Sequence, residues 1–139
     1  MMNSHKARIA VIAMAVVEHI PHTPRLFLEQ LCRCVKPGGM IALDTPNLAR
    51  YWNRIKLANS ESVFMDIKSQ YYAELPYEGH HREYTGSELR WMLGQLGCKE
   101  IESVYFDYNL HQFDQIDRPH IECLLRIIED PTYADTILV

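Results

Sequence analysis

The stretch that decides the fold is Ile9-Ala-Val-Ile-Ala-Met-Ala-Val-Val17, which is followed by a second apolar run, Met40-Ile-Ala-Leu43. Neither run alternates between apolar and polar residues, which is typical of strands buried on both faces of a parallel sheet. Between them, Thr23 and Pro24 predict the start of a helix, with Thr23 as the N-cap, and Lys36-Pro37-Gly38-Gly39 predicts its end. Strand, helix and strand in succession form a βαβ unit.

The rest of the chain continues this alternation. Thr85-Gly86-Ser87-Glu88 is a capping box, and it predicts a helix that Gly97 ends. Residues 101–108 and 136–139 are predicted to be strands. Strands that alternate with helices indicate an α/β protein.

Two further segments complete this interpretation, in which residues 1–139 form a single domain. Asn47 is predicted to cap a helix that follows the second strand. Residues 59–79 show no sustained period, so we interpret them as a long loop or lid. A helix is predicted between Pro119 and Pro131, with an apolar stripe at helical spacing formed by Ile121, Leu124, Leu125 and Ile128.

Composition narrows the class of protein. The chain has 139 residues, of which 47% are hydrophobic and 23% charged, and its net charge is −4. This acidic balance argues against a nucleic-acid or anionic-membrane partner, because both need a basic face. The cysteines do not form a C-x-x-C pair, so we expect reduced thiols and a cytoplasmic protein. Residues 5–17 imitate a signal peptide, but their small-residue site lies inside the apolar run and not after it.

Four motifs, in order, carry a resemblance to a known family. They are Val16-Val17-Glu18-His19-Ile20-Pro21, Leu31-Cys32-Arg33-Cys34-Val35-Lys36-Pro37-Gly38-Gly39, Thr45-Pro46-Asn47 and Gly79-His80-His81-Arg82-Glu83-Tyr84-Thr85. At these spacings the chain resembles class I S-adenosylmethionine-dependent methyltransferases, of the type that includes ubiquinone-pathway O-methyltransferases. The resemblance covers residues 9–108. It implies a partial Rossmann-like sheet, made of the family's strands four to seven and the helices between them.

The resemblance also implies what the chain does not contain. The family binds S-adenosylmethionine with a glycine-rich turn after its first strand, and no G-x-G cluster follows a strand here. We therefore expect that the N-terminal βαβ half is lacking and that the chain alone does not bind the cofactor normally. Strand 9–15 would then have an open apolar edge, which predicts a homo-oligomer or a complementing chain at that edge.

Candidate site residues follow from the same resemblance, because ligands of an open α/β sheet bind at the carboxyl ends of its strands. Glu18, His19, His80 and His81 are the candidate catalytic residues, with either histidine as a general base. Met14 and Ala15 are placed beside the cofactor, and Asn47 and Tyr84 beside the substrate. Each also has a structural interpretation: Glu18 and His19 as turn residues, His80 packed on Tyr84, and Asn47 as a helix cap.

A divalent metal is the less favoured cofactor. Some relatives hold one with an E-x-x-E-H motif and a later histidine, and Glu18, His19 and His80 match three of those positions. Ala15 occupies the position of the first acid, which removes one ligand.

Two functions remain open from the sequence. One is methylation of an oxygen or nitrogen atom of a small-molecule acceptor, by an enzyme that another chain completes. The other is a non-catalytic remnant or interaction module, which keeps the family's core but not its cofactor site.

Overall fold

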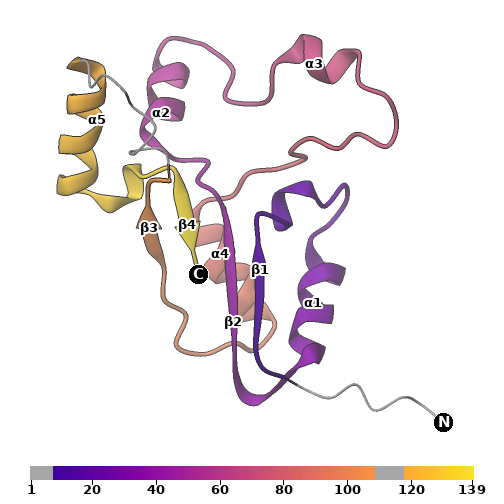
Figure 1. Cartoon of the computed structure of the whole chain (residues 1–139). Coiled ribbons are helices and arrows are strands. Elements are labelled where there is room, and N and C mark those ends of the chain that lie inside the picture. Colours follow the sequence, from indigo (N-terminus) through magenta and orange to yellow (C-terminus); the bar gives the residue numbers. More distant parts are fainter. Residues whose placement is uncertain (1–7, 109–117) are drawn as a thin grey trace.

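The computed structural model describes residues 8–108 and 118–139, which contain a four-stranded mixed sheet (Figure 1). The strand order is β1-β2-β4-β3. β1 is parallel to β2, whereas β4 is antiparallel to both of its neighbours. The strands are β1 (Arg8–Met14), β2 (Val35–Pro46), β3 (Val104–Phe106) and β4 (Thr136–Leu138). This arrangement confirms the α/β class.

The helices divide into those that cover the sheet and those at its end. α1 joins β1 to β2, α2 and α5 lie beyond one end of the sheet, and α3 lies on a long excursion away from it (Figure 1). This excursion is the segment 59–79, and α3 is a short helix within it. The helices are η1 (Val17–His19), α1 (Arg25–Cys34), α2 (Tyr51–Ala58), α3 (Ile67–Tyr71), α4 (Gly86–Gln95), α5 (Arg118–Glu129) and η3 (Pro131–Tyr133). Within the described residues, none of these helices has the length and apolar character of a membrane span.

The core lies on one face of the sheet. Leu28 of α1 and Leu93 of α4 pack with Ala13 of β1 and Leu43 of β2. A second cluster joins Val17, Tyr84, Leu89 and Ile137. Since α1 and α4 both contribute to the first cluster, they cover the same face.

Much of the opposite face of the sheet is exposed, although Asp44 and Thr136 on it are buried, so the prediction that the first two strands are buried on both faces is wrong for the described residues. Register places the side chains of Ile12, Met14, Met40 and Val104 on this face, because paired residues of adjacent strands share a side. Their exposed fractions are 66%, 43%, 61% and 54%. We call these four residues the bare face. Within the described residues, the outer edge of β1 is also unpaired.

Local signals for the helix ends are confirmed at α4 and corrected at α1. Thr85 and Glu88 form the reciprocal capping box, and Gly97 follows α4 with a φ of 82°. Because α1 begins at Arg25, its N-cap is Pro24, and Thr23 only accepts a 3.3 Å hydrogen bond from the Arg25 N–H.

The glycine-rich stop after α1 is part of a strand. Residues 36–39 belong to β2, where the register jumps from Arg8 against Val35 to Ala10 against Met40. A Cβ on Gly39 would lie 2.6 Å from the carbonyl oxygen of Ile9, so the two backbones approach too closely for any other residue.

Other boundaries moved by a few residues. β1 ends at Met14 and is followed by η1 from Val17, and β3 is shorter than the predicted segment 101–108. β4 confirms the predicted last strand. The four cysteines are free thiols, and burial raises the pKa of Cys123 to about 11.

Candidate functional site

Polar side chains meet where β1 and β2 end. Glu18 follows β1 in the short helix η1 and is only 1% exposed. Its carboxylate Oε2 accepts a 3.2 Å hydrogen bond from the hydroxyl of Thr45, a buried residue of β2. A buried carboxylate needs such partners, and this bond fixes its orientation at the carboxyl edge of the sheet.

The segment before α4 brings a second part of the site. The backbone carbonyl of Glu18 accepts a 2.7 Å hydrogen bond from the N–H of His81, which holds residues 78–84 against η1. His19 Nδ1 lies 3.0 Å from the carbonyl oxygen of Glu78. Because a carbonyl oxygen only accepts, the neutral His19 ring is protonated on Nδ1 and carries its lone pair on Nε2. The His19 and His80 rings meet edge to face, 4.8 Å apart.

His80 is oriented by a carboxylate. Its Nδ1 lies 3.3 Å from Oε1 of Glu83, and the other oxygen of Glu83 accepts a 3.0 Å bond from Arg50. Since Glu83 accepts the Nδ1 proton, the lone pair of neutral His80 is on Nε2. A histidine oriented in this way can take a proton from an acceptor group.

His81 lies differently from its neighbour. Its Nε2 is 3.2 Å from the carbonyl oxygen of Tyr77, so this nitrogen is the protonated one. The His81 ring stacks edge to face on the Tyr77 ring and does not belong to the cluster around Glu18. The structure thus separates two histidines that are adjacent in the sequence.

Glu18, His19 and His80 have the chemistry of a metal-binding site. Their ligand atoms all lie within 4.8 Å of one another. One carboxylate and two imidazoles form a donor set that suits Zn²⁺, Mn²⁺ or Fe²⁺, whereas Mg²⁺ prefers oxygen ligands. Because neighbouring N and O ligands of a tetrahedral Zn²⁺ are about 3.3–3.4 Å apart, these side chains must draw together to share an ion. The residues present therefore fit a borderline divalent ion.

The two candidate substrate residues are buried. Asn47 is 1% exposed, and its Nδ2 donates to the carbonyl oxygens of Thr132 and Ala134. Its Oδ1 accepts from the Ala49 N–H, but the N-cap of α2 is Arg50, so the prediction that Asn47 caps this helix is wrong. Tyr84 belongs to the second core cluster, and burial raises the pKa of its hydroxyl.

Met14 and Ala15, the candidate cofactor residues, lie at the end of β1 and are exposed. Ala15 has a φ of 50°, which is strained for a residue other than glycine. Its N–H donates a 2.6 Å hydrogen bond to Oδ1 of Asp44, and the hydroxyl of Tyr108 donates to Oδ2 at 3.2 Å. The bond to Asp44 raises the pKa of Tyr108.

Three supporting residues were not among the predicted site residues. Glu83 follows His80 by three positions, a spacing that could have indicated the pair. Thr45 lies inside a predicted motif, but only the pairing of β1 with β2 places its hydroxyl on Glu18. Tyr108 reaches Asp44 across 64 positions, and no sequence pattern predicts that contact.

Comparison with known proteins identifies the family. Residues 6–103 match the family model described as a methyltransferase domain. A solved structure, that of a SAM-dependent methyltransferase from Archaeoglobus fulgidus, has the same fold with a TM-score of 0.53 and 20% sequence identity. The match covers 96% of this chain and 58% of that one. Among curated proteins, none matches. The family match extends over more than half of the sequence, and the chain therefore belongs to the methyltransferase-domain family.

Proposed function

We propose that this chain carries the acceptor side of an S-adenosylmethionine-dependent methyltransferase that methylates an oxygen or nitrogen atom of a small molecule. The observation that carries the proposal is the cluster of Glu18, His19 and His80 at the carboxyl ends of β1 and β2, in a chain of this family. When bound, S-adenosylmethionine supplies the electrophilic methyl group.

In this proposal His80 removes the acceptor's proton. The proton moves to Nε2 of His80 as the acceptor atom attacks the methyl carbon, and Glu83 stabilises the resulting imidazolium through Nδ1. Glu18, fixed by Thr45, orients the acceptor. A divalent ion held by Glu18, His19 and His80 would occupy the same Nε2 lone pair of His80, so it is an alternative to the general base; it would polarise the acceptor oxygen and favour the loss of its proton.

We further propose that the cofactor-binding turn comes from a polypeptide that docks on β1. A parallel sheet is normally buried on both faces, and an apolar edge without charge or proline is a template for strand pairing. From Ile9 to Met14, β1 has such an edge, and the bare face lies beside it. A strand added at β1, with a helix over Ile12 and Met40, would bury both surfaces.

Binding of radiolabelled S-adenosylmethionine tests whether a polypeptide docked on β1 supplies the cofactor-binding turn. We expect no saturable micromolar binding by the purified chain, and we expect binding by the tagged chain isolated from its own cells together with its partner. Ile12→Asp on the bare face should abolish both co-isolation of the partner and binding of the labelled S-adenosylmethionine. Leu26→Asp, at an equally exposed position on α1, should remove neither.

Each other outcome decides against part of the proposal. Micromolar binding by the chain alone would show that no complementing polypeptide is needed. A partner complex that neither binds S-adenosylmethionine nor transfers methyl groups would favour the non-catalytic interaction module.

The donor set predicts metal binding that calorimetry can measure. Mn²⁺ or Zn²⁺ titrated into the chain should bind at one site, with Mg²⁺ much weaker, because two of the three donors are nitrogens. Glu18→Gln and His80→Ala should each abolish the heat, whereas His22→Ala, at an exposed position, should not. Equal heats for all four proteins would exclude a metal site here. Thermal unfolding of each variant checks that the fold is intact.

A further inference from the structure

Helix α5 presents an apolar stripe to solvent. Ile121, Leu125 and Ile128 follow at i, i+4 and i+7, so they lie on one side of the helix. Their exposed fractions are 48%, 55% and 78%, although such a stripe normally packs on a core. The buried residue of α5 is Cys123, on the opposite side. Single exposed apolar residues are ordinary, but a row of three on one helix indicates a contact surface.

Charged residues of alternating sign run along one flank of this stripe. In chain order they are Arg118, Glu122, Arg126 and Glu129. They form two pairs within the helix, at 3.6 Å and 3.3 Å, and all four side chains are exposed. Exposed pairs of this kind contribute little to stability, so they compete only weakly with other ionic contacts.

The order of charges along α5 is complementary to the same order read in the opposite direction, so two antiparallel copies of the helix can pair opposite charges. Consider a second α5 that runs antiparallel and is centred on Leu124. Glu122 then faces Arg126 of the second copy, and Arg118 comes within one residue of Glu129 of that copy. A two-fold axis brings the same flank of both helices together, so each ionic contact forms twice. A parallel pair with the apolar stripes in contact would instead put the two charged flanks on opposite sides, so these ionic contacts would not form.

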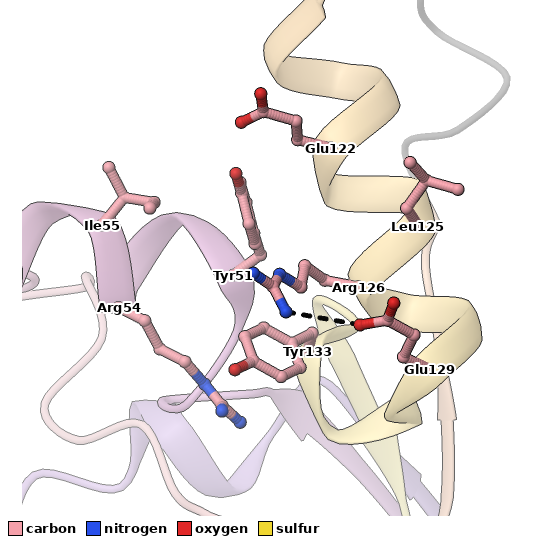
Figure 2. A pocket seen from close by; sticks show the side chains of 8 residues that line it. All are labelled: Tyr51, Arg54, Ile55, Glu122, Leu125, Arg126, Glu129 and Tyr133. Atoms are coloured by element: carbon pink, nitrogen blue, oxygen red, sulfur yellow. Dashed lines mark hydrogen bonds and ion pairs between the residues drawn. The ribbon is translucent and has the colours of Figure 1, made fainter.

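The same register aligns the apolar stripes. Ile121 of one copy comes within one residue of Ile128 of the other, and Leu125 packs near the axis. The neighbouring groove widens the surface: a cavity of about 700 Å³ separates α5 from α2, with Tyr51, Ile55 and Tyr133 along it. Figure 2 shows Glu122 and Arg126 on the side of α5 that faces this groove.

We propose that α5 is a self-association surface, which pairs antiparallel with α5 of a second copy of this chain. A pair of short helices buries less than the roughly 1,200–2,000 Å² of a standard stable interface, so the dimer is weak and concentration-dependent. This surface shares no residue with the cluster around Glu18 or with the edge of β1, and the inference therefore does not depend on the proposed methyl transfer.

Charge-reversal variants of the full chain test this pairing. In sedimentation equilibrium at low salt, Glu122→Arg alone and Arg126→Glu alone should each weaken association at least tenfold, because like charges then face each other. An equimolar mixture of the two variants should recover the wild-type dissociation constant, since each arginine at 122 or 126 then faces a glutamate of the other variant. Arg25→Glu on α1 serves as the control and should not change association.

Recovery in the mixture is specific to antiparallel α5, because association through β1 would not respond to these charges. Leu125→Asp should give a monomer in every combination. A mixture that stays as dissociated as the single variants overturns the proposal, and so does a wild-type chain that is monomeric at every concentration.

Discussion

In the assembled enzyme, His80→Gln should lower kcat by about 10²- to 10⁴-fold, the range that a positioned general base contributes. The glutamine keeps a polar side chain but cannot take a proton. The KM for S-adenosylmethionine should stay within about threefold, because His80 lies on the acceptor side of the proposed site. Initial rates of methyl transfer from labelled cofactor provide the measurement.

Two comparisons make this expectation specific to His80. The His81→Gln variant should lose much less activity, because the Nε2 of His81 is bonded to the Tyr77 carbonyl. Equal losses at both positions would contradict the assignment. His22→Gln, at an exposed position outside the cluster, should leave kcat unchanged.

Leu43→Ala should destabilise the fold by about 2–5 kcal/mol, as expected when a buried leucine is truncated and leaves a cavity. Leu43 is 1% exposed and joins β2 to α1 and α4 through Leu28 and Leu93. A loss of this size is a large fraction of the stability of an ordinary domain. Urea denaturation followed by circular dichroism measures the change in the free energy of unfolding.

Met40→Ala is the matched control for this substitution. Met40 lies three residues earlier in β2 but on the bare face, so its truncation should cost less than about 0.5 kcal/mol, as for other surface changes. A larger cost at Met40 than at Leu43 would mean that the core lies on the other side of the sheet.

The sequence predicted best what depends on neighbouring residues. The capping box at Thr85 and the stop at Gly97 were predictable because their partners lie within a few positions. Burial was predicted less well, because the apolar pattern of β1 or α5 does not tell which other element packs on it. In the structure, both segments expose apolar residues that their patterns predict to be buried.

The candidate site shows the same division. Glu18, His19 and His80 could be predicted because strand ends and the order of motifs placed them at one edge of the sheet, and their ligand atoms do converge. The different hydrogen-bond partners of His80 and His81 could not be predicted, since they depend on which of the two rings contacts Glu83. Asn47 and Tyr84 match the family motif, but their burial ties them to the core.

Asn47 has a consequence for the order in which the protein folds. Its amide bonds reach 85 and 87 positions along the chain, and Leu43 exchanges two backbone bonds with Val139. Such distant contacts form late, because their loop must close before any contact compensates for the lost entropy. During synthesis, β1, α1 and β2 can therefore pair long before β2 gains its second neighbour. Glu18, His19 and His80 are all synthesised before residues 134–139. The strand β2, which holds Thr45, becomes fully hydrogen-bonded only after residues 134–139 have been made.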